Sequence, residues 1–147
     1  MDMPFWRLYY HAVWATKNRE PLVVDTMIDP IVRAISETMQ EQGVTVFAVG
    51  VMPEHVHVLA QIPPPLAVAT VVGRWKGASA HAANEHQPLG AHKLIWQSGY
   101  GILSVSQHGF DRARAYVENQ RERHAKSDLY GLLERSTDEL PEQARPQ

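Results

Sequence analysis

The stretch VTVFAVGVMPEHVHVLAQIPPP, residues 44–65, contains two runs rich in β-branched and apolar residues, separated by one proline and one glutamate. The runs Val44–Met52 and His55–Ile62 are typical of β-strands, and the short connection through Pro53 and Glu54 predicts a hairpin. The prolines at 63–65 cannot extend a strand ladder, so they end the second strand. The rest of the fold is predicted outward from this hairpin.

The segment before the hairpin predicts a strand followed by an amphipathic helix. Phe5–Thr16 is dense in aromatic and β-branched residues and contains no breaker, which favours a strand. We expect Asp29 to cap a helix that has Pro30 in its first turn and stops at Gly43. Apolar residues recur every four positions along this helix, at Ile31, Ile35 and Met39.

The segment after the hairpin predicts a helix, a strand and a last helix. We expect helices at Leu66–His86 and Asp111–Lys126, with a strand over residues 100–106 between them. The order β-α-β-β-α-β-α predicts an α+β, ferredoxin-like (split βαβ) antiparallel sheet. Its two crossover helices would cover one face, and a further C-terminal helix would carry Tyr116. Residues 1–126 are predicted to be a single domain, and residues 127–147 a polar tail.

Composition limits the class of protein without assigning a function. The 147 residues are 44% hydrophobic and 20% charged, which is ordinary for one soluble globular domain. The absence of cysteine excludes disulfides, thiolate metal sites and cysteine nucleophiles. No apolar run approaches the ~20 residues that span a bilayer, and no signal pattern is present, so we expect a cytoplasmic protein without a membrane partner. The net charge of −2 does not indicate a nucleic-acid binder, although a local basic patch would be enough for one.

His55 and His57 form the first candidate site. Residues two apart on a strand share a face, so both imidazoles project together and are able to hold one divalent ion. The alternative is a pair of hydrogen-bonded, partly exposed histidines on an open sheet face, and a third ligand is needed to decide against it. Glu54, beside the pair, either orients an imidazole or is an ordinary turn residue.

The last helix offers the missing groups. Tyr116 and Gln120 are four residues apart, so they lie on the same side of a helix, at the edge of an apolar stripe formed by Phe110, Ala113 and Val117. The glutamine carbonyl is a suitable ligand for a hard cation. The alternative for Tyr116 is a boundary residue with a buried ring and a solvated hydroxyl.

Together these groups suit phosphodiester chemistry. A metal held by two histidines and a glutamine can act as a Lewis acid, and a nearby phenol can attack phosphorus to form a phosphotyrosine without ATP. A phosphoesterase with paired His-X-Thr/Ser motifs is excluded, because no histidine is followed two places later by threonine or serine. A generic zinc hydrolase would leave Tyr116 and Gln120 unexplained.

Five blocks of sequence, in order, resemble one known family, and they span most of residues 9–124. The family is the single-tyrosine HUH transposases of small bacterial insertion sequences (TnpA type), with their REP-associated relatives. The blocks are YYHAVWATKNREPLV (9–23), VMPEHVHVLAQIPP (51–64), WKGASA (75–80), WQSGYGILSVS (96–106) and YVENQ (116–120).

This resemblance implies a ferredoxin-like fold and a transposase with Tyr116 as its nucleophile. It implies that His55, His57 and Gln120 bind Mg²⁺ or Mn²⁺, and that no nucleotide cofactor is used. The substrate would be single-stranded DNA with hairpin ends, cut and rejoined through a 5′-phosphotyrosine. A homodimer is implied, in which Tyr116 acts within its own chain or on the partner's histidines. The alternative is a domesticated relative that binds structured single-stranded nucleic acid without transposition.

The chain departs from the family in being slightly acidic, with few cations around the second helix. We expect DNA binding that is weaker and more sensitive to salt than in a basic relative, or else a patch drawn from several segments, although for any single cation ordinary surface charge is the favoured interpretation. The candidates are Arg7, Lys17, Arg19, Arg74, Lys76 and Lys93. Trp75 and Trp96 are candidates to stack on unpaired bases, but tryptophan is at least as often a core residue.

Overall fold

The computed structural model describes residues 4–88 and 90–120. The element order β-α-β-β-α-β-α predicted from the sequence is confirmed, with a short 3-10 turn after β1 and another after α1. The elements are β1 (Tyr9–Ala15), η1 (Lys17–Arg19), α1 (Asp25–Glu37), η2 (Gln40–Gln42), β2 (Thr45–Val51), β3 (His55–Gln61), α2 (Val68–Glu85), β4 (Gly101–Val105) and α3 (Phe110–Glu118).

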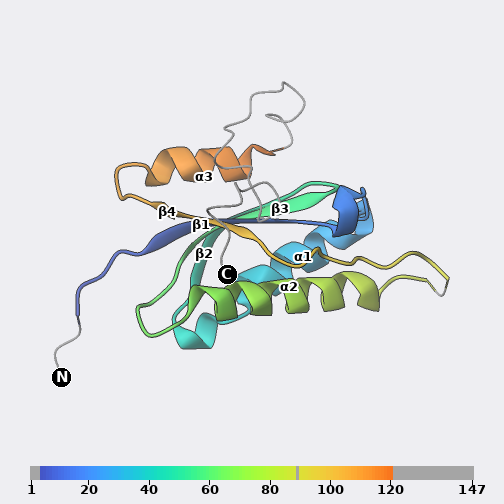
Figure 1. The fold of residues 1–147 in the computed structure, drawn as a ribbon, viewed down its shortest axis with the longest axis horizontal. Helices are drawn as coiled ribbons and strands as arrows, with labels where there is room; N and C mark the ends of the chain where they lie inside the picture. Colours follow the sequence, from blue (N-terminus) through green and yellow to red (C-terminus); the bar gives the residue numbers. More distant parts are fainter. Residues whose placement is uncertain (1–3, 89, 121–147) are drawn as a thin grey trace.

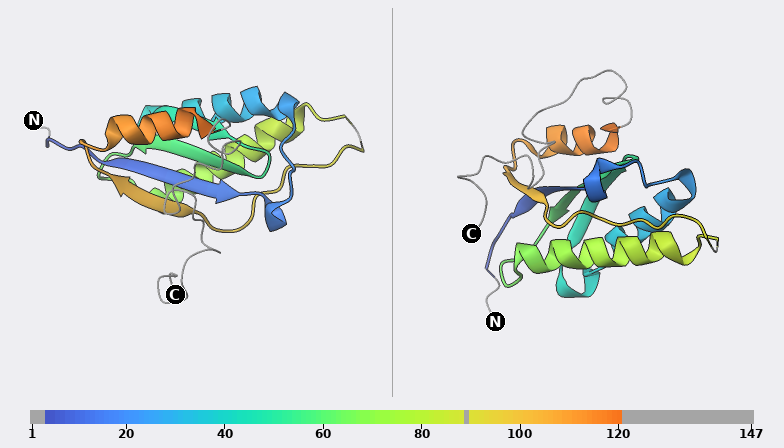
Figure 2. Two further views of the ribbon diagram at one scale, coloured as in Figure 1. Left: turned by 90° about the horizontal axis from the view of Figure 1, so that it is seen from above. Right: turned by 45° about the vertical axis from the view of Figure 1, so that its right-hand side comes forward.

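The four strands form one sheet in the order β2-β3-β1-β4, and every neighbouring pair is antiparallel. This order is that of the ferredoxin-like fold, so the predicted α+β class is confirmed. Helices α1 and α2 cover one face of the sheet, whereas α3 lies on the other face (Figure 1; Figure 2, right). Within the described residues, no helix is both long and apolar enough to span a bilayer.

The main core lies between the sheet and the pair α1 and α2, as the sequence predicted. The strands contribute alternate residues such as Trp14, Val56 and Val58, all fully buried. Burying these side chains on one face directs the intervening residues of β1 and β3 to the opposite face. The tertiary fold therefore fixes which residues of the hairpin meet α3.

A second, smaller core attaches α3 to the sheet. Ala113 and Val117 of α3 pack on Ala48 and Leu59. Phe110 anchors the beginning of the helix against two aromatic residues, with ring centroids 4.8 Å from Tyr9 and 4.9 Å from Phe47. Phe47 and Ala48 both join this cluster, although they are neighbours in sequence, because β2 has a register shift between residues 46 and 48.

Both ends of α1 differ from the prediction. The helix ends at Glu37, well before Gly43. The helix begins at Asp25 rather than after Asp29, and Pro30 lies inside it. Met27 is fully buried one turn before Ile31, so the earlier turn adds apolar burial that outweighs the one backbone hydrogen bond lost at the proline.

The last helix, α3, ends at Glu118 and does not continue through residue 120 as predicted, because Asn119 leaves the helical conformation. The predicted domain boundary after residue 126, and the predicted turns of this helix after residue 120, lie outside the described residues.

Candidate active site

His55 and His57 lie on the face of β3 that meets α3. Both side chains are fully buried, whereas Val56 and Val58 between and after them belong to the main core on the other face. The predicted shared face is therefore confirmed. The alternative of partly exposed histidines on an open sheet face is wrong, because both side chains are 0% exposed.

Tyr116 lies on α3, and Gln120 lies two residues beyond the end of that helix. Their side chains are 1% and 2% exposed, so Tyr116 is not the boundary residue with a solvated hydroxyl that the sequence left open. The ring centroids of Tyr116 and His57 are 5.9 Å apart, and the planes meet at 79°. The structure thus places Tyr116 beside His57, which contacts His55, and places Gln120 against the strand residue that pairs with His57.

Gly50 permits this close approach. It pairs directly with His57 across the β2–β3 ladder. A Cβ atom at residue 50 would lie 2.5 Å from the Val117 carbonyl oxygen and 2.8 Å from Cγ of Gln120. Only glycine leaves room for the α3 backbone at this distance, so Gly50 sets how far Tyr116 and Gln120 stand from the histidines.

We expect Gly50→Ala to displace α3 and to lower the free energy of unfolding by about 1–3 kcal/mol, the usual cost of overpacking. Urea unfolding measures this change. Gly77→Ala is the matched control, because a Cβ atom there meets nothing within 4 Å in the exposed part of α2. Alanine at that helical position should raise stability by about 0.5–1 kcal/mol. An unchanged unfolding midpoint for Gly50→Ala would contradict the packing described.

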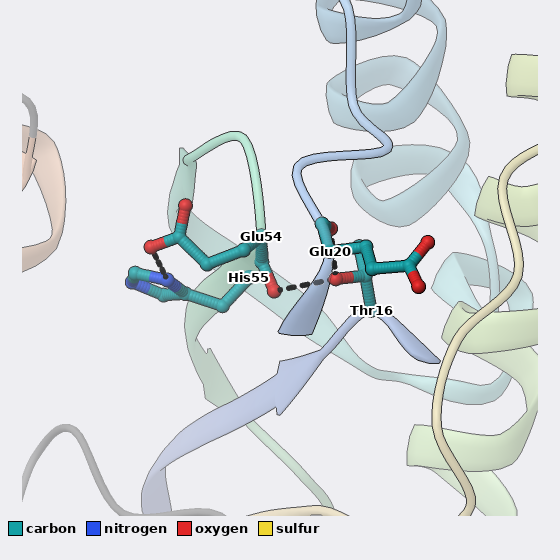
Figure 3. Close-up of polar contacts among 4 residues, drawn as sticks. All are labelled: Thr16, Glu20, Glu54 and His55. Atoms are coloured by element: carbon teal, nitrogen blue, oxygen red, sulfur yellow. Dashed lines mark hydrogen bonds and ion pairs between the residues drawn. The ribbon is translucent and has the colours of Figure 1, made fainter. Parts of the chain in front are cut away.

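A carboxylate orients the first histidine. Nδ1 of His55 lies 3.0 Å from Oε1 of Glu54, and the carboxylate points toward the imidazole (Figure 3). The turn that carries Glu54 is fixed by Thr16, whose backbone N–H donates to the Glu54 carbonyl at 2.8 Å. The Thr16 hydroxyl lies within hydrogen-bond distance of the carbonyls of Glu54 (3.2 Å) and Glu20 (2.5 Å), while the Glu20 carboxylate points away from the site (Figure 3).

A third histidine contacts the second one. His11 of β1 is 1% exposed, and its Nε2 lies 2.7 Å from Nδ1 of His57. His11 could not be joined to the pair from the sequence, because it has no ligand spacing with the other histidines. The structure therefore adds a residue that the sequence analysis missed.

The donor set fits a divalent ion. The two histidines each engage Nδ1 with a protein group, which makes Nε2 the natural coordinating atom of each ring. Nε2 of Gln120 donates a hydrogen bond to the Tyr116 carbonyl at 2.9 Å. The side-chain oxygen, Oε1, is the atom of Gln120 that could coordinate a cation. Among residues 4–88 and 90–120, no group of three or more His, Cys, Asp or Glu could hold a metal.

Comparison with known proteins identifies the family. The model of the family "Transposase IS200 like" matches residues 4–120, which include the whole sheet and all of α3. The chain belongs to the IS200-like transposase family. Its members are transposases, so the chain is a DNA-binding protein of DNA transposition.

Individual relatives agree with this family. The ISDra2 transposase TnpA of Deinococcus radiodurans is 30% identical over 122 residues, which cover 80% of this chain and 87% of that protein. A crystal structure assigned as a transposase from D. radiodurans R1 has a TM-score of 0.61 at 31% identity, covering 82% of this chain and 95% of that one. A REP-associated tyrosine transposase, solved bound to a REP hairpin, shares the fold with a TM-score of 0.58 at 16% identity, covering 84% and 74% of the two chains.

The six cations predicted to meet DNA lie in several places. Arg7 precedes β1 and Lys17 with Arg19 follows it, so they lie beyond opposite ends of that strand. Arg74 is exposed on α2, on the other side of the sheet from α3, and Lys93 is exposed in the loop after α2. DNA contact by these residues stays a prediction. Trp75 is 1% exposed in the main core, so it is not available to stack on a base.

Lys76 has a structural role within α2. Its Nζ donates hydrogen bonds to the carbonyls of Gln97 at 2.7 Å and Gly99 at 2.9 Å, which ties the segment before β4 to the helix. Partial burial lowers the pKa of the Lys76 ammonium below the ordinary lysine value, because desolvation disfavours its charge.

We expect Lys76→Met to lower the free energy of unfolding by about 1 kcal/mol, because the two carbonyls lose a charged donor but remain partly accessible to water. Urea unfolding provides the measurement. Lys93→Met removes the same charge from an exposed loop and should leave stability nearly unchanged. Equal stabilities for the two variants would show that the contacts of Lys76 contribute nothing.

Proposed function

We propose that this transposase cleaves and rejoins single-stranded DNA at hairpin ends through a 5′-phosphotyrosine intermediate formed on Tyr116. One observation carries the proposal: a buried tyrosine lies against a histidine pair, with 5.9 Å between the rings of Tyr116 and His57. The ring contact with His57 places the tyrosine beside the proposed metal ligands, where a bound ion could activate its phenol. The REP hairpin bound to the REP-associated relative supports the choice of a hairpin substrate.

In this proposal, His55, His57 and Gln120 hold one Mg²⁺ or Mn²⁺ ion. When bound, the ion supplies Lewis-acid polarisation of the scissile phosphate and stabilises the charge on the departing oxygen. Glu54 keeps the ring of His55 in place through the Nδ1 contact. The packing of α3 on Gly50 holds the Gln120 side chain against β2, at the residue that pairs with His57.

The bond changes in the proposed cleavage balance without a further reactant. The Tyr116 oxygen forms a bond to phosphorus, and the bond from phosphorus to the 3′ oxygen breaks. The phenol loses its proton and the departing 3′ oxygen gains one, so the products are a 5′-phosphotyrosine and a free 3′-hydroxyl. Attack of a 3′-hydroxyl on the phosphotyrosine reverses these changes, which accounts for rejoining without ATP.

Access to the site requires movement, because Tyr116 and both histidines are almost fully buried. The small cluster under α3 is a weaker attachment than the main core, so we propose that DNA displaces α3 to reach the tyrosine. Tyr116 lies beside His57 of its own chain, and action on the histidines of a partner is the alternative that the family resemblance implies. The homodimer implied by the family resemblance stays a proposal, and light scattering of the purified protein measures it.

Strand exchange between two oligonucleotides tests the proposed activity. One labelled single strand from the flank of the protein's own gene is mixed with an unlabelled, longer strand from the other flank. We expect a labelled product of a new length with Mn²⁺, and none with EDTA. Retardation of the DNA on a native gel without any exchange would instead support the domesticated binder. The absence of DNA binding would contradict both the strand-transfer activity and the domesticated binder.

A further inference from the structure

The position of His11 on β1 allows its imidazole to hydrogen-bond the imidazole of His57 on the neighbouring strand. Val13 pairs with His57 in the β1–β3 ladder, so His11 is its diagonal neighbour on the same face. Such diagonal neighbours are about 7–8 Å apart, within reach of aromatic side chains. Nε2 of His11 closes this gap and lies 2.7 Å from Nδ1 of His57.

The two rings meet along a hydrogen bond rather than face to face. Their planes differ by only 11°, and their centroids are 4.9 Å apart. Stacked rings would keep their atoms at about 3.5 Å or more, whereas the two nitrogens are 2.7 Å apart. The rings of His11 and His57 therefore lie edge to edge in nearly one plane, which is the geometry that directs an imidazole N–H at an imidazole lone pair.

This hydrogen bond has only two neutral forms, and they differ in what His57 can do. If Nδ1 of His57 donates, Nε2 of His57 keeps its lone pair and can bind a metal. If Nε2 of His11 donates instead, Nδ1 of His57 is the acceptor, and Nε2 of His57 carries the proton that blocks coordination. The side of the bond that holds the proton therefore decides whether His57 is a ligand.

We propose that His11 is a positioning residue that accepts a hydrogen bond from Nδ1 of His57 and so fixes the tautomer and ring direction needed for metal binding through Nε2. This inference rests on the proposed function, because it assigns His57 to a metal. Glu54 performs the same task for His55, so each histidine of the pair has its own acceptor at Nδ1. His11 never touches the metal or the DNA in this account.

The test compares two substitutions of His11 with a control. His11→Leu removes the hydrogen-bond acceptor, and the introduced leucine packs beside the apolar cross-strand neighbours Leu59 and Leu103. His11→Gln restores an acceptor oxygen. His81→Leu, an exposed histidine of α2 on the other side of the sheet, is the matched control. Thermal unfolding of each variant establishes that the protein is folded.

The first readout is the tautomer of His57 in the metal-free protein. Long-range ¹H–¹⁵N spectra in mildly alkaline buffer distinguish a protonated Nδ1 from a protonated Nε2, and the His57→Ala spectrum assigns the signals. We expect the proton on Nδ1 in the wild-type protein, in His11→Gln and in His81→Leu, and a shift toward Nε2 in His11→Leu. A wild-type protein with the proton on Nε2 overturns the inference, even if His11→Leu fails to fold.

The second readout is Mn²⁺ affinity without DNA, measured from the paramagnetic resonance signal of free Mn²⁺. We expect His11→Leu to bind about 10–100-fold more weakly, the usual effect of removing a partner behind a metal ligand, and His11→Gln to recover most of the loss. Equal affinity and an equal tautomer in folded His11→Leu would overturn the inference and leave the proposed function intact. If the wild-type protein and His57→Ala bind Mn²⁺ equally, the proposed metal site fails, whereas the tautomer readout still decides the role of His11.

Discussion

Tyr116→Phe should abolish cleavage of single-stranded DNA while leaving hairpin binding nearly unchanged. The substitution removes one oxygen, the proposed nucleophile, and keeps the ring that packs against His57 and His11. Loss of a covalent nucleophile lowers a rate by on the order of 10⁴-fold or more. Cleavage is measured with end-labelled single strands on a denaturing gel, and binding by retardation of the same strands on a native gel.

Tyr9→Phe is the matched control for this prediction. Tyr9 lies under the same helix, where its ring packs against Phe110 with centroids 4.8 Å apart. It is removed from the histidine pair by the length of β1, because Ala15 at the other end of that strand pairs with His55. Loss of its hydroxyl should leave cleavage intact. Undiminished cleavage by Tyr116→Phe would assign the nucleophile to another residue.

His57→Ala is expected to have the second largest effect. It removes one of two proposed imidazole ligands, and it leaves the buried Nε2 of His11 without its partner ring. Lewis-acid stabilisation is worth several kcal/mol, so metal-dependent cleavage should fall by about 10²–10⁴-fold. The rates are measured with Mn²⁺ and with EDTA for both proteins.

The control for His57→Ala is His108→Ala, because His108 is exposed in the loop before α3. This variant should cut at the wild-type rate and lose activity in EDTA. The metal site is wrong if His57→Ala cuts normally and does so in EDTA as well. A loss of stability is distinguished from a loss of metal by repeating the assay below the unfolding temperature of each variant.

The fold and the histidine pair could be predicted because they depend on local patterns. The alternation in β3 determines which of its residues share a face, whatever the strand pairs with. The side chains of His55 and His57 must therefore project from the same face. The spacing of Ala113 and Val117 likewise fixes the side of α3 that packs on the sheet. Both patterns are carried by residues within one element, and both are found in the structure.

The roles of His11 and Gly50 could not be predicted, because they depend on register and on helix placement. His11 meets His57 across 46 residues of sequence, and a shift of the β1–β3 pairing by one residue would turn it to the other face. Gly50 matters only because the α3 backbone passes above it. A lone glycine in a strand indicates a bulge or a close approach without saying which.

The start of α1 and the position of Trp75 show how packing overrides local preference. Proline favours the first turn of a helix, yet burial of Met27 extends α1 by a turn before Pro30. Trp75 shares the buried side of α2 with Val71 and Val72, and its ring lies 6.5 Å from that of Trp14. The sequence alone could not distinguish a stacking surface from this core position.

The most direct test of the central claim is to locate the DNA on the protein. Wild-type protein is incubated with Mn²⁺ and single-stranded DNA from the flanks of its own gene, and the covalent complex is digested with nuclease and trypsin. Mass spectrometry should find a nucleotide joined through its 5′ phosphate to the peptide AYVENQR, residues 115–121, at Tyr116. A nucleotide on any other residue, or no covalent complex with either Mg²⁺ or Mn²⁺, would contradict the account.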